Sequence, residues 1–208
     1  MGDRDDRLVI QFAREPFVGK VKTRMQPELS VFQSLALHEA LVEHICLSVM
    51  EAGVAAVQLW VAGNVDHPLF LRLSEAGVAG VHQQRGADLG VRMSTALHQG
   101  LSCYKKVVLV GSDCVHLDKD YLEQAFSALD ACPLVFGPAA DGGYVLVGVR
   151  GVVPDVFTGV QWGSAKVMEQ TRKRSEMVDT VWLELDSRAD IDRPSDLKLL
   201  EGVISGAW

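Results

Sequence analysis

The stretch Val107-Val-Leu-Val-Gly-Ser-Asp113 gives the clearest fold signal: four apolar residues run into a small turn and then a carboxylate. Short apolar runs bounded by charge and glycine are typical of buried strands, so a β-strand is predicted over Lys106–Val110. Helical patterns flank this strand at Asp88–Leu101 and from Asp118 to about Asp130. Strands that alternate with helices favour a mostly parallel sheet with helices on both faces, an α/β fold.

The same alternation extends along the chain in both directions. Further strands are predicted at Leu8–Phe12, Val57–Val61, Val78–Gln83, Leu134–Phe136, Tyr144–Val149 and Val178–Leu185. Further helices are predicted from the N-cap Ser30 to about Glu51 with Gly53 as stop, from Asp66 and Pro68 to Gly77, over Ser164–Ser175 and over Asp196–Ile204. The short link before Tyr144 predicts some antiparallel pairing, because parallel neighbours need a longer crossover. Without repeats or a linker, 1–208 is interpreted as one domain.

Composition excludes several classes of protein. The chain has 208 residues, 48% hydrophobic and 23% charged, as in a globular protein with a sizeable core. A net charge of −7 argues against a nucleic-acid partner, and no apolar run approaches the ~20 residues of a membrane span. The charged start Met1–Arg7 has no signal-peptide pattern, and the four cysteines show no CxxC spacing. A cytoplasmic location with reduced thiols is expected, and the oligomeric state stays open.

Common catalytic and cofactor motifs are missing. The fragment Val18-Gly-Lys-Val-Lys-Thr23 is not a P-loop, since Arg14 stands where that motif needs its first glycine. No Gly-x-Gly-x-x-Gly follows the first strand, and no Gly-x-Ser-x-Gly or His-Glu-x-x-His occurs. The search therefore turns to polar residues that follow strands, because ligands of open α/β sheets bind beyond the carboxyl ends.

A cation-rich loop follows the first strand. Arg14, Lys20, Lys22 and Arg24 lie within eleven residues, and Gly19 permits close backbone approach. Several donors of this kind suit a polyphosphate, so these residues are predicted to bind the phosphates of a nucleotide. The alternative is a solvated basic loop.

Carboxylates follow two other strands. Asp113, after Ser112, and Asp192, just before the last helix, are hard oxygen donors that can share one Mg²⁺ or Mn²⁺. Asp141, in Asp141-Gly-Gly-Tyr144, is the reserve ligand, and the glycines of that stretch let a substrate approach backbone N–H groups. The alternatives are helix caps for the first two and a tight hairpin turn for the third.

Five short motifs, taken in order, resemble the bacterial radical-SAM/selenodomain-associated transferase family, which is grouped with GT-A-fold nucleotide-diphospho-sugar transferases. They are Arg14-Glu-Pro-x-x-Gly-Lys-Val-Lys-Thr-Arg24, Gly86-Ala-Asp-Leu-Gly-x-Arg-Met93, Gly111-Ser-Asp-Cys114, Gly137-Pro-x-x-Asp-Gly-Gly-Tyr144 and Asp190-Ile-Asp-x-Pro-x-Asp-Leu197. The match runs from about Leu8 to Leu200. Val115 replaces the family's usual proline, and Ser164 replaces a threonine.

The resemblance implies a Rossmann-like three-layer α/β/α sandwich of GT-A type with a mixed, mostly parallel sheet. It implies Asp113 and Asp192 as metal ligands and catalytic residues, with Lys22 on the phosphates. The remaining expected nucleotide-binding residues are Arg14, Gly19, Lys20, Arg24, Gly86, Asp88, Leu89, Gly90, Arg92 and Ser112. The expected substrate-binding residues are Asp141, Gly142, Gly143, Tyr144, Trp162 and Ser164.

These residues fit a metal-dependent transferase with a nucleotide-activated donor and a small-molecule acceptor. Glycosyl transfer from a nucleotide-diphospho-sugar is preferred because of the family. The alternative is nucleotidyl transfer from a nucleoside triphosphate to a phosphorylated small molecule, as in phospholactate guanylyltransferase. A non-catalytic nucleotide-binding domain is the second alternative.

Overall fold

The computed structural model describes residues 6–26 and 28–204, so most of the charged stretch Met1–Arg7 lies outside the described residues. These residues form a seven-stranded sheet in the order β3-β2-β1-β4-β6-β5-β7. The strands are β1 Arg7–Arg14, β2 Ala56–Ala62, β3 Gly80–Gln83, β4 Lys106–Val110, β5 Leu134–Pro138, β6 Tyr144–Arg150 and β7 Trp182–Glu184. The helices are α1 Val31–Ala52, α2 Pro68–Glu75, α3 Leu89–Leu101, α4 Lys119–Ala131 and α5 Val167–Met177, with 3₁₀ helices η2 Thr23–Met25 and η3 Pro194–Leu200.

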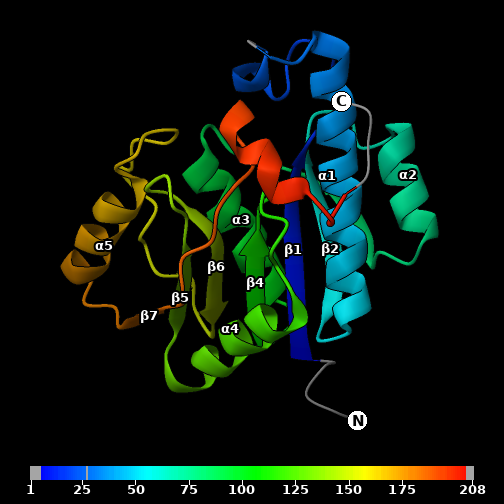
Figure 1. Cartoon of the computed structure of the whole chain (residues 1–208). Helices are drawn as coiled ribbons and strands as arrows, with labels where there is room; N and C mark the ends of the chain where they lie inside the picture. Colours follow the sequence, from blue (N-terminus) through cyan, green and yellow to red (C-terminus); the bar gives the residue numbers. More distant parts are fainter. Residues whose placement is uncertain (1–5, 27, 205–208) are drawn as a thin grey trace.

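Helices cover both faces of this sheet (Figure 1). On one face, α1 and α4 pack over the strands in one apolar cluster, and α1 and α2 share a second cluster. On the other face, α3 and α5 contribute Met93, Leu97 and Met168 to a third cluster. The chain therefore has the three-layer α/β/α architecture that was expected.

Strand β4 shows why helices must cover both faces of the sheet. Val108 and Val110 point into the cluster beneath α1 and α4, whereas Val107 and Leu109 point into the cluster beneath α3 and α5. Successive side chains of a strand alternate between faces, so a strand buried on both sides reads as a continuous apolar run. The prediction of a buried strand over Lys106–Val110 is confirmed with the same bounds.

Strand β6 runs opposite to both of its neighbours. It pairs antiparallel with β4 and with β5, whereas β1, β2, β3 and β4 pair in parallel. The five residues between Pro138 and Tyr144 are enough for a hairpin but not for a crossover, as the sequence predicted. The mixed, mostly parallel sheet is confirmed, and the β5–β6 hairpin brings its tip to the edge where β1 and β4 end.

Polar caps set the helix starts that the sequence predicted. Ser30 accepts a hydrogen bond from the backbone N–H of Gln33, whose side chain in turn accepts from the Ser30 N–H. Asp88 caps α3 and Asp118 caps α4 in the same way, each accepting a backbone N–H three residues on. Such caps satisfy N–H groups that have no partner within the helix.

Several predicted element bounds were wrong, among them the start of β3, which is Gly80 and not Val78. Pro68 is the first residue of α2, so His67 and not Asp66 is the N-cap, and its ring accepts from the Leu69 N–H. Helix α5 begins at Val167 instead of Ser164. The Ser164 hydroxyl donates to the Gln161 carbonyl and accepts from the Lys166 N–H, which closes a separate turn.

Two further errors lie near the C-terminal end. The predicted strand Val178–Leu185 is reduced to β7, because the N–H groups of Val178 and Thr180 bond back to the last turn of α5. The predicted helix Asp196–Ile204 is instead the 3₁₀ helix η3 over Pro194–Leu200. Among the described residues, no helix has the length and apolar character needed to cross a membrane.

Gly148 in β6 provides a test of this packing. A Cβ there would lie 2.6 Å from Val135 Cγ1 and 3.2 Å from Val108 Cγ2, so Gly148→Ala should lower the free energy of unfolding by about 1–3 kcal/mol. Gly111→Ala is the control, because its Cβ would meet no atom within 4 Å. Urea unfolding followed by circular dichroism compares the two, and an equal stability for both variants would contradict the packing described.

Candidate functional site

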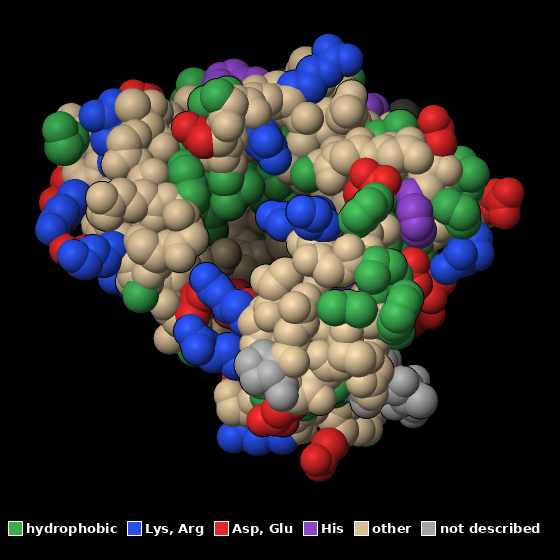
Figure 2. All heavy atoms as spheres, turned by 90° about the horizontal axis from the view of Figure 1, so that it is seen from above, with side chains coloured by type: hydrophobic (Ala, Val, Ile, Leu, Met, Phe, Trp, Pro, Cys, Tyr) green, Lys and Arg blue, Asp and Glu red, His purple; other side chains and the backbone are tan. Residues whose placement is uncertain are grey.

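Two adjoining cavities open at the edge where the parallel strands end. We call one the basic cleft, with a volume of about 620 Å³, and the other the apolar cavity, with a volume of about 240 Å³. Figure 2 looks onto this edge and shows a hollow with hydrophobic side chains on one wall and Lys and Arg side chains around its rim. The order of the strands along the sheet changes direction between β1 and β4: β2 and β3 follow on one side of β1, and β4 lies on the other. Open α/β sheets bind ligands at such a position.

The basic cleft gathers most of the residues predicted to bind a nucleotide. It is lined by Arg14, Lys20, Lys22, Arg24, Leu89, Arg92, Ser112, Asp113 and Asp192, together with His38, Gln84 and others. These residues come from the loop after β1, the start of α3, the end of β4 and the segment before η3. The fold thus brings together the cation-rich loop and both predicted metal ligands, which are far apart in sequence.

Buried polar contacts fix the start of the loop after β1. His38 on α1 bonds through Nε2 to the Arg14 carbonyl at 2.9 Å, and burial lowers the pKa of this histidine. Gln11 Nε2 donates to the Ser112 hydroxyl at 2.9 Å, and that hydroxyl donates to the Phe12 carbonyl at 2.8 Å. The side chain of Ser112 therefore ties the end of β4 to β1, so any contact with a nucleotide comes from its backbone or its remaining lone pair.

Lys22 joins three segments of the site. Its side chain is only 4% exposed, and Nζ donates to Asp113 Oδ1 at 2.7 Å and to the carbonyl of Ile191. The Ile191 N–H in turn donates to the Asp113 carbonyl at 2.9 Å. Lys22 adopts the left-handed conformation, with φ of 48°, which is uncommon for a residue with a side chain. This strained residue is held in place by the ion pair that it forms.

Arg24 and Asp192 form a second pair across the same edge. Arg24 Nη1 lies 2.6 Å from Asp192 Oδ2, and this contact raises the pKa of the guanidinium. The cap of η3 is provided by Asp196, which accepts the backbone N–H groups of Asp192 and Arg193. The alternative of Asp192 as a helix cap therefore finds no support, and its carboxylate faces the basic cleft.

Four carboxylates lie at this edge. Asp190, which lines the apolar cavity, has its pKa raised to about 7, first by burial and then by Asp113 and Asp141. Among the described residues, Asp113 pairs with Lys22 and Asp192 pairs with Arg24, whereas Asp141 and Asp190 form no ion pair. The negative charge of these unpaired carboxylates can be relieved by a bound cation or by a proton on Asp190.

The start of α3 contributes only part of what was expected. Arg92 lines the basic cleft, and its Nε donates to the Gly86 carbonyl at 3.1 Å, which closes the turn before the helix. Asp88 is occupied as the N-cap, and together with Gly90 it lines a different surface hollow, on the side of Phe157. Gly19 lies at the exposed tip of its loop, where an added Cβ would meet no atom within 4 Å.

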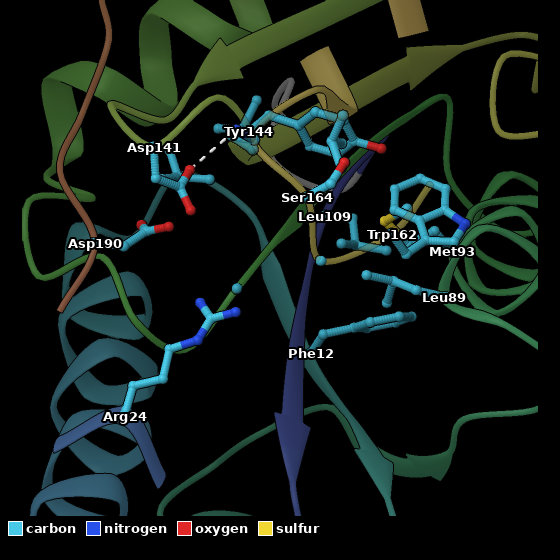
Figure 3. A pocket seen from close by; sticks show the side chains of 16 residues that line it. Phe12, Arg24, Leu89, Met93, Leu109, Asp141, Tyr144, Trp162, Ser164 and Asp190 are labelled. Carbon is cyan, nitrogen blue, oxygen red and sulfur yellow. Dashed lines mark hydrogen bonds between the residues drawn. The ribbon is translucent and has the colours of Figure 1, made fainter. Parts of the chain in front are cut away.

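The apolar cavity holds the residues predicted to bind substrate. Asp141, Gly143, Tyr144, Trp162 and Ser164 line it, and Gly142 lies beside it without lining it. Burial raises the pKa of the Tyr144 phenol, which therefore stays neutral. Asp141 Oδ1 accepts the Gly143 N–H at 3.0 Å, the dashed contact in Figure 3, so the hairpin tip is preformed.

Trp162 forms a wall of both cavities. Phe12, Arg24, Leu89, Gly111 and Gly163 do so as well. The Trp162 indole packs edge-on to Tyr144, with ring centroids 6.4 Å apart, and lies against the first turn of α3. A Cβ on Gly90 would lie 2.7 Å from Trp162 Cζ2, so glycine is needed there for the indole to pack.

Several lining residues were missed in the sequence. Asp190 belongs to a quoted motif, but only its burial between β4 and the hairpin distinguishes it from Asp192. Gln84 directly follows β3 and donates to the Ala13 and Trp60 carbonyls. The rule that sites lie just beyond strand ends would have found it. Phe12 could not be found, since an apolar residue within a strand looks like core.

The donors at this edge suit Mg²⁺ or Mn²⁺ in type. Asp113 and Asp192 each use one carboxylate oxygen in an ion pair, and hard cations prefer oxygen ligands. Within the described residues, no three His, Cys, Asp or Glu side chains are grouped as a preformed metal site. Magnesium is often held by one or two carboxylates with substrate phosphates. The residues fit a cation that binds together with a nucleotide.

Solved structures of other proteins share this architecture. A protein from Desulfovibrio desulfuricans G20, described as a "putative nucleotide-diphospho-sugar transferase", is 29% identical with a TM-score of 0.83, over 94% of this chain and 86% of that chain. A 4-diphosphocytidyl-2C-methyl-D-erythritol synthase from Anaerococcus prevotii is 8% identical with a TM-score of 0.65, over 96% and 98%. Rv0371c from Mycobacterium tuberculosis H37Rv, solved with manganese, is 16% identical with a TM-score of 0.53, over 95% and 98%.

The last two matches establish a shared fold, and all agree with the expected Rossmann-like fold of GT-A type. The Desulfovibrio protein is described as a transferase, in agreement with the class of enzyme predicted from the sequence. No curated protein sequence is significantly similar to the chain. A family model described as "Uncharacterized protein conserved in bacteria (DUF2064)" matches residues 45–164, more than half of the chain, and the chain therefore belongs to this family.

Proposed function

We propose that the chain transfers a group from a nucleotide-activated donor, and that the donor is a nucleotide-diphospho-sugar. The observation that carries this proposal is the basic cleft beside four carboxylates at the carboxyl edge of the sheet. Cationic side chains bind phosphates, and a departing phosphate is stabilised by positive charge. Carboxylates can supply that charge by binding a metal ion. The similarity to the Desulfovibrio protein supports the same reaction class.

The charge of the basic cleft suits a diphosphate. In the part of the chain that the structure describes, Arg14, Lys20 and Arg92 line the cleft without forming an ion pair, whereas Lys22 and Arg24 already pair with aspartates. Charge-assisted hydrogen bonds from such groups are about twice as strong as neutral ones. Three available cations match the two to three negative charges of a diphosphate better than the four of a triphosphate.

Asp113 and Asp192 are proposed to hold Mg²⁺ or Mn²⁺, with Asp141 as the reserve ligand. Bound there, the cation would neutralise charge on the leaving diphosphate. Lys22 keeps the end of β4 and the Asp190–Asp192 segment in register, so the two carboxylates are positioned before any ligand arrives. Trp162 and the Asp141–Tyr144 hairpin shield the reacting groups from water on the acceptor side.

Nucleotidyl transfer is the second candidate, favoured by the five cations that line the cleft in total. It differs in its products: a triphosphate donor releases pyrophosphate, whereas a sugar nucleotide releases a nucleoside diphosphate. A non-catalytic nucleotide-binding domain would release neither. The narrower resemblance to the radical-SAM/selenodomain-associated family, and the interpretation of 1–208 as one domain, stay predictions.

Removing one available cation should weaken donor binding. Arg92→Ala should lower the affinity for the best ligand of a sugar-nucleotide panel by about 1.5–3 kcal/mol, the range for hydrogen bonds to charged groups. Isothermal titration measures this loss. Arg85→Ala is the control, because Arg85 is exposed in the loop just before α3 but does not line the cleft. Equal affinities for the two variants would remove the start of α3 from the phosphate site.

Asp113→Asn tests the metal. The substitution removes charge at nearly constant volume and leaves an amide oxygen that can accept from Lys22, so the chain should stay folded at some cost in stability. Mn²⁺-dependent release of nucleoside diphosphate should fall by at least about 100-fold, or roughly 2.7 kcal/mol. The control is Asp118→Asn, a helix cap outside both cavities that asparagine replaces well. Full turnover by Asp113→Asn, measured by product chromatography, would rule out this carboxylate as a ligand.

A further inference from the structure

The apolar cavity has two chemically different sides. Figure 3 shows Phe12, Leu89, Met93 and Trp162 on one side of it, and Asp141, Asp190 and Arg24 on the other. Ligand pockets of this composition bind molecules that bury a hydrophobic part and direct a few polar groups at fixed partners. The cavity is therefore built for an amphipathic small molecule.

The polar side of the cavity carries negative charge. Arg24 is its one cation in the described chain, and this guanidinium already pairs with Asp192 at 2.6 Å. Asp141 and Asp190 lack an ion-pair partner among the described residues. A phosphate or carboxylate on the ligand would face these two aspartates, whereas a hydroxyl or an ammonium group could donate hydrogen bonds to them.

The apolar side offers a rigid aromatic surface. The Trp162 indole is held by Tyr144, by Phe157 at a centroid distance of 6.4 Å, and by the close approach to Gly90. Rings that stack on such a fixed face gain binding free energy beyond that from area burial. Aliphatic contacts from Leu89 and Met93 continue this surface into the cavity.

We infer that the apolar cavity binds the acceptor, and that the acceptor is a neutral or cationic molecule with an aromatic ring or a hydrophobic group of similar size. Its hydroxyl or amine would face Asp141 and Asp190 while its ring lies against Trp162. The assignment of this ligand as an acceptor rests on the proposed function, whereas the ligand chemistry rests on the cavity alone. Phosphorylated acceptors, such as those of the nucleotidyl alternative considered above, are disfavoured.

Three probes with one ring and different charge test this inference. The affinities of 2-phenylethylamine, 2-phenylethanol and phenylacetate for the full chain are measured by ligand-observed NMR titration, without nucleotide. The amine and the alcohol should bind at least tenfold more tightly than phenylacetate. Ethanolamine, which keeps the polar groups without the ring, should bind at least tenfold more weakly than the amine.

Variants locate the binding. Trp162→Ala should weaken binding of the alcohol at least fivefold, whereas Phe32→Ala should leave it unchanged, because Phe32 is a 70% exposed aromatic outside the cavity. Asp141→Asn keeps the oxygen that accepts the Gly143 N–H but removes the charge, so it should reduce the preference for amine over phenylacetate at least threefold. Circular dichroism confirms that each variant is folded.

The inference is overturned if phenylacetate binds as tightly as the amine, or if Trp162→Ala binds the alcohol as the unaltered chain does. Its failure differs from failure of the proposed function. If sugar nucleotides bind and turn over while the ring probes bind elsewhere, the transferase proposal is supported and this acceptor class is wrong. If the ring probes bind at Trp162 but no nucleotide binds the chain, the ligand chemistry of the cavity is supported and the transferase proposal is wrong.

Discussion

The contact of Lys22 with Asp113 and the Ile191 carbonyl is the interaction on which the site depends. It joins the loop after β1, the end of β4 and the segment before η3, although the two ionic partners are 91 positions apart. A nearly buried lysine that lost its carboxylate would be an uncompensated charge, which makes the arrangement strongly interdependent. The strained backbone of Lys22 is tolerated because this contact determines where its side chain must lie.

The geometry of the two cavities follows from that contact and from the direction of β6. Parallel strands bring the basic loop and Asp113 to one edge, and the single antiparallel strand brings the Asp141–Tyr144 hairpin to the same edge. The cations line the basic cleft together with Asp113 and Asp192, whereas the apolar cavity has Asp141 and Asp190 on its polar side. A donor and an acceptor placed in these cavities would meet at the wall that the cavities share, which includes Arg24 and Trp162.

Local sequence patterns predicted the strands and helix caps, but they could not predict contacts between residues far apart in the sequence. Lys106–Val110 and Ser30 carry their own signals, a continuous apolar run and a capping side chain, and both were predicted correctly. Strand β7 is short because the N–H groups of Val178 and Thr180 bond back to the last turn of α5. No local sequence pattern predicts these hydrogen bonds. Asp190 resembles any other aspartate in sequence; its pKa is set by neighbours that only the folded chain supplies. Most of the predicted site residues line one of the two cavities, although residues such as Gly19, Asp88 and Gly90 do not. The ion pairs among these residues were not predicted.

The wall shared by the two cavities has a thermodynamic consequence. Trp162 touches both spaces, so a ligand that packs against the indole in one cavity can change the free energy of binding in the other. Such coupling is reciprocal: if the first ligand strengthens binding of the second by some factor, the second strengthens binding of the first by the same factor. Gly90, by letting the indole pack, then contributes to this coupling without contacting either ligand itself.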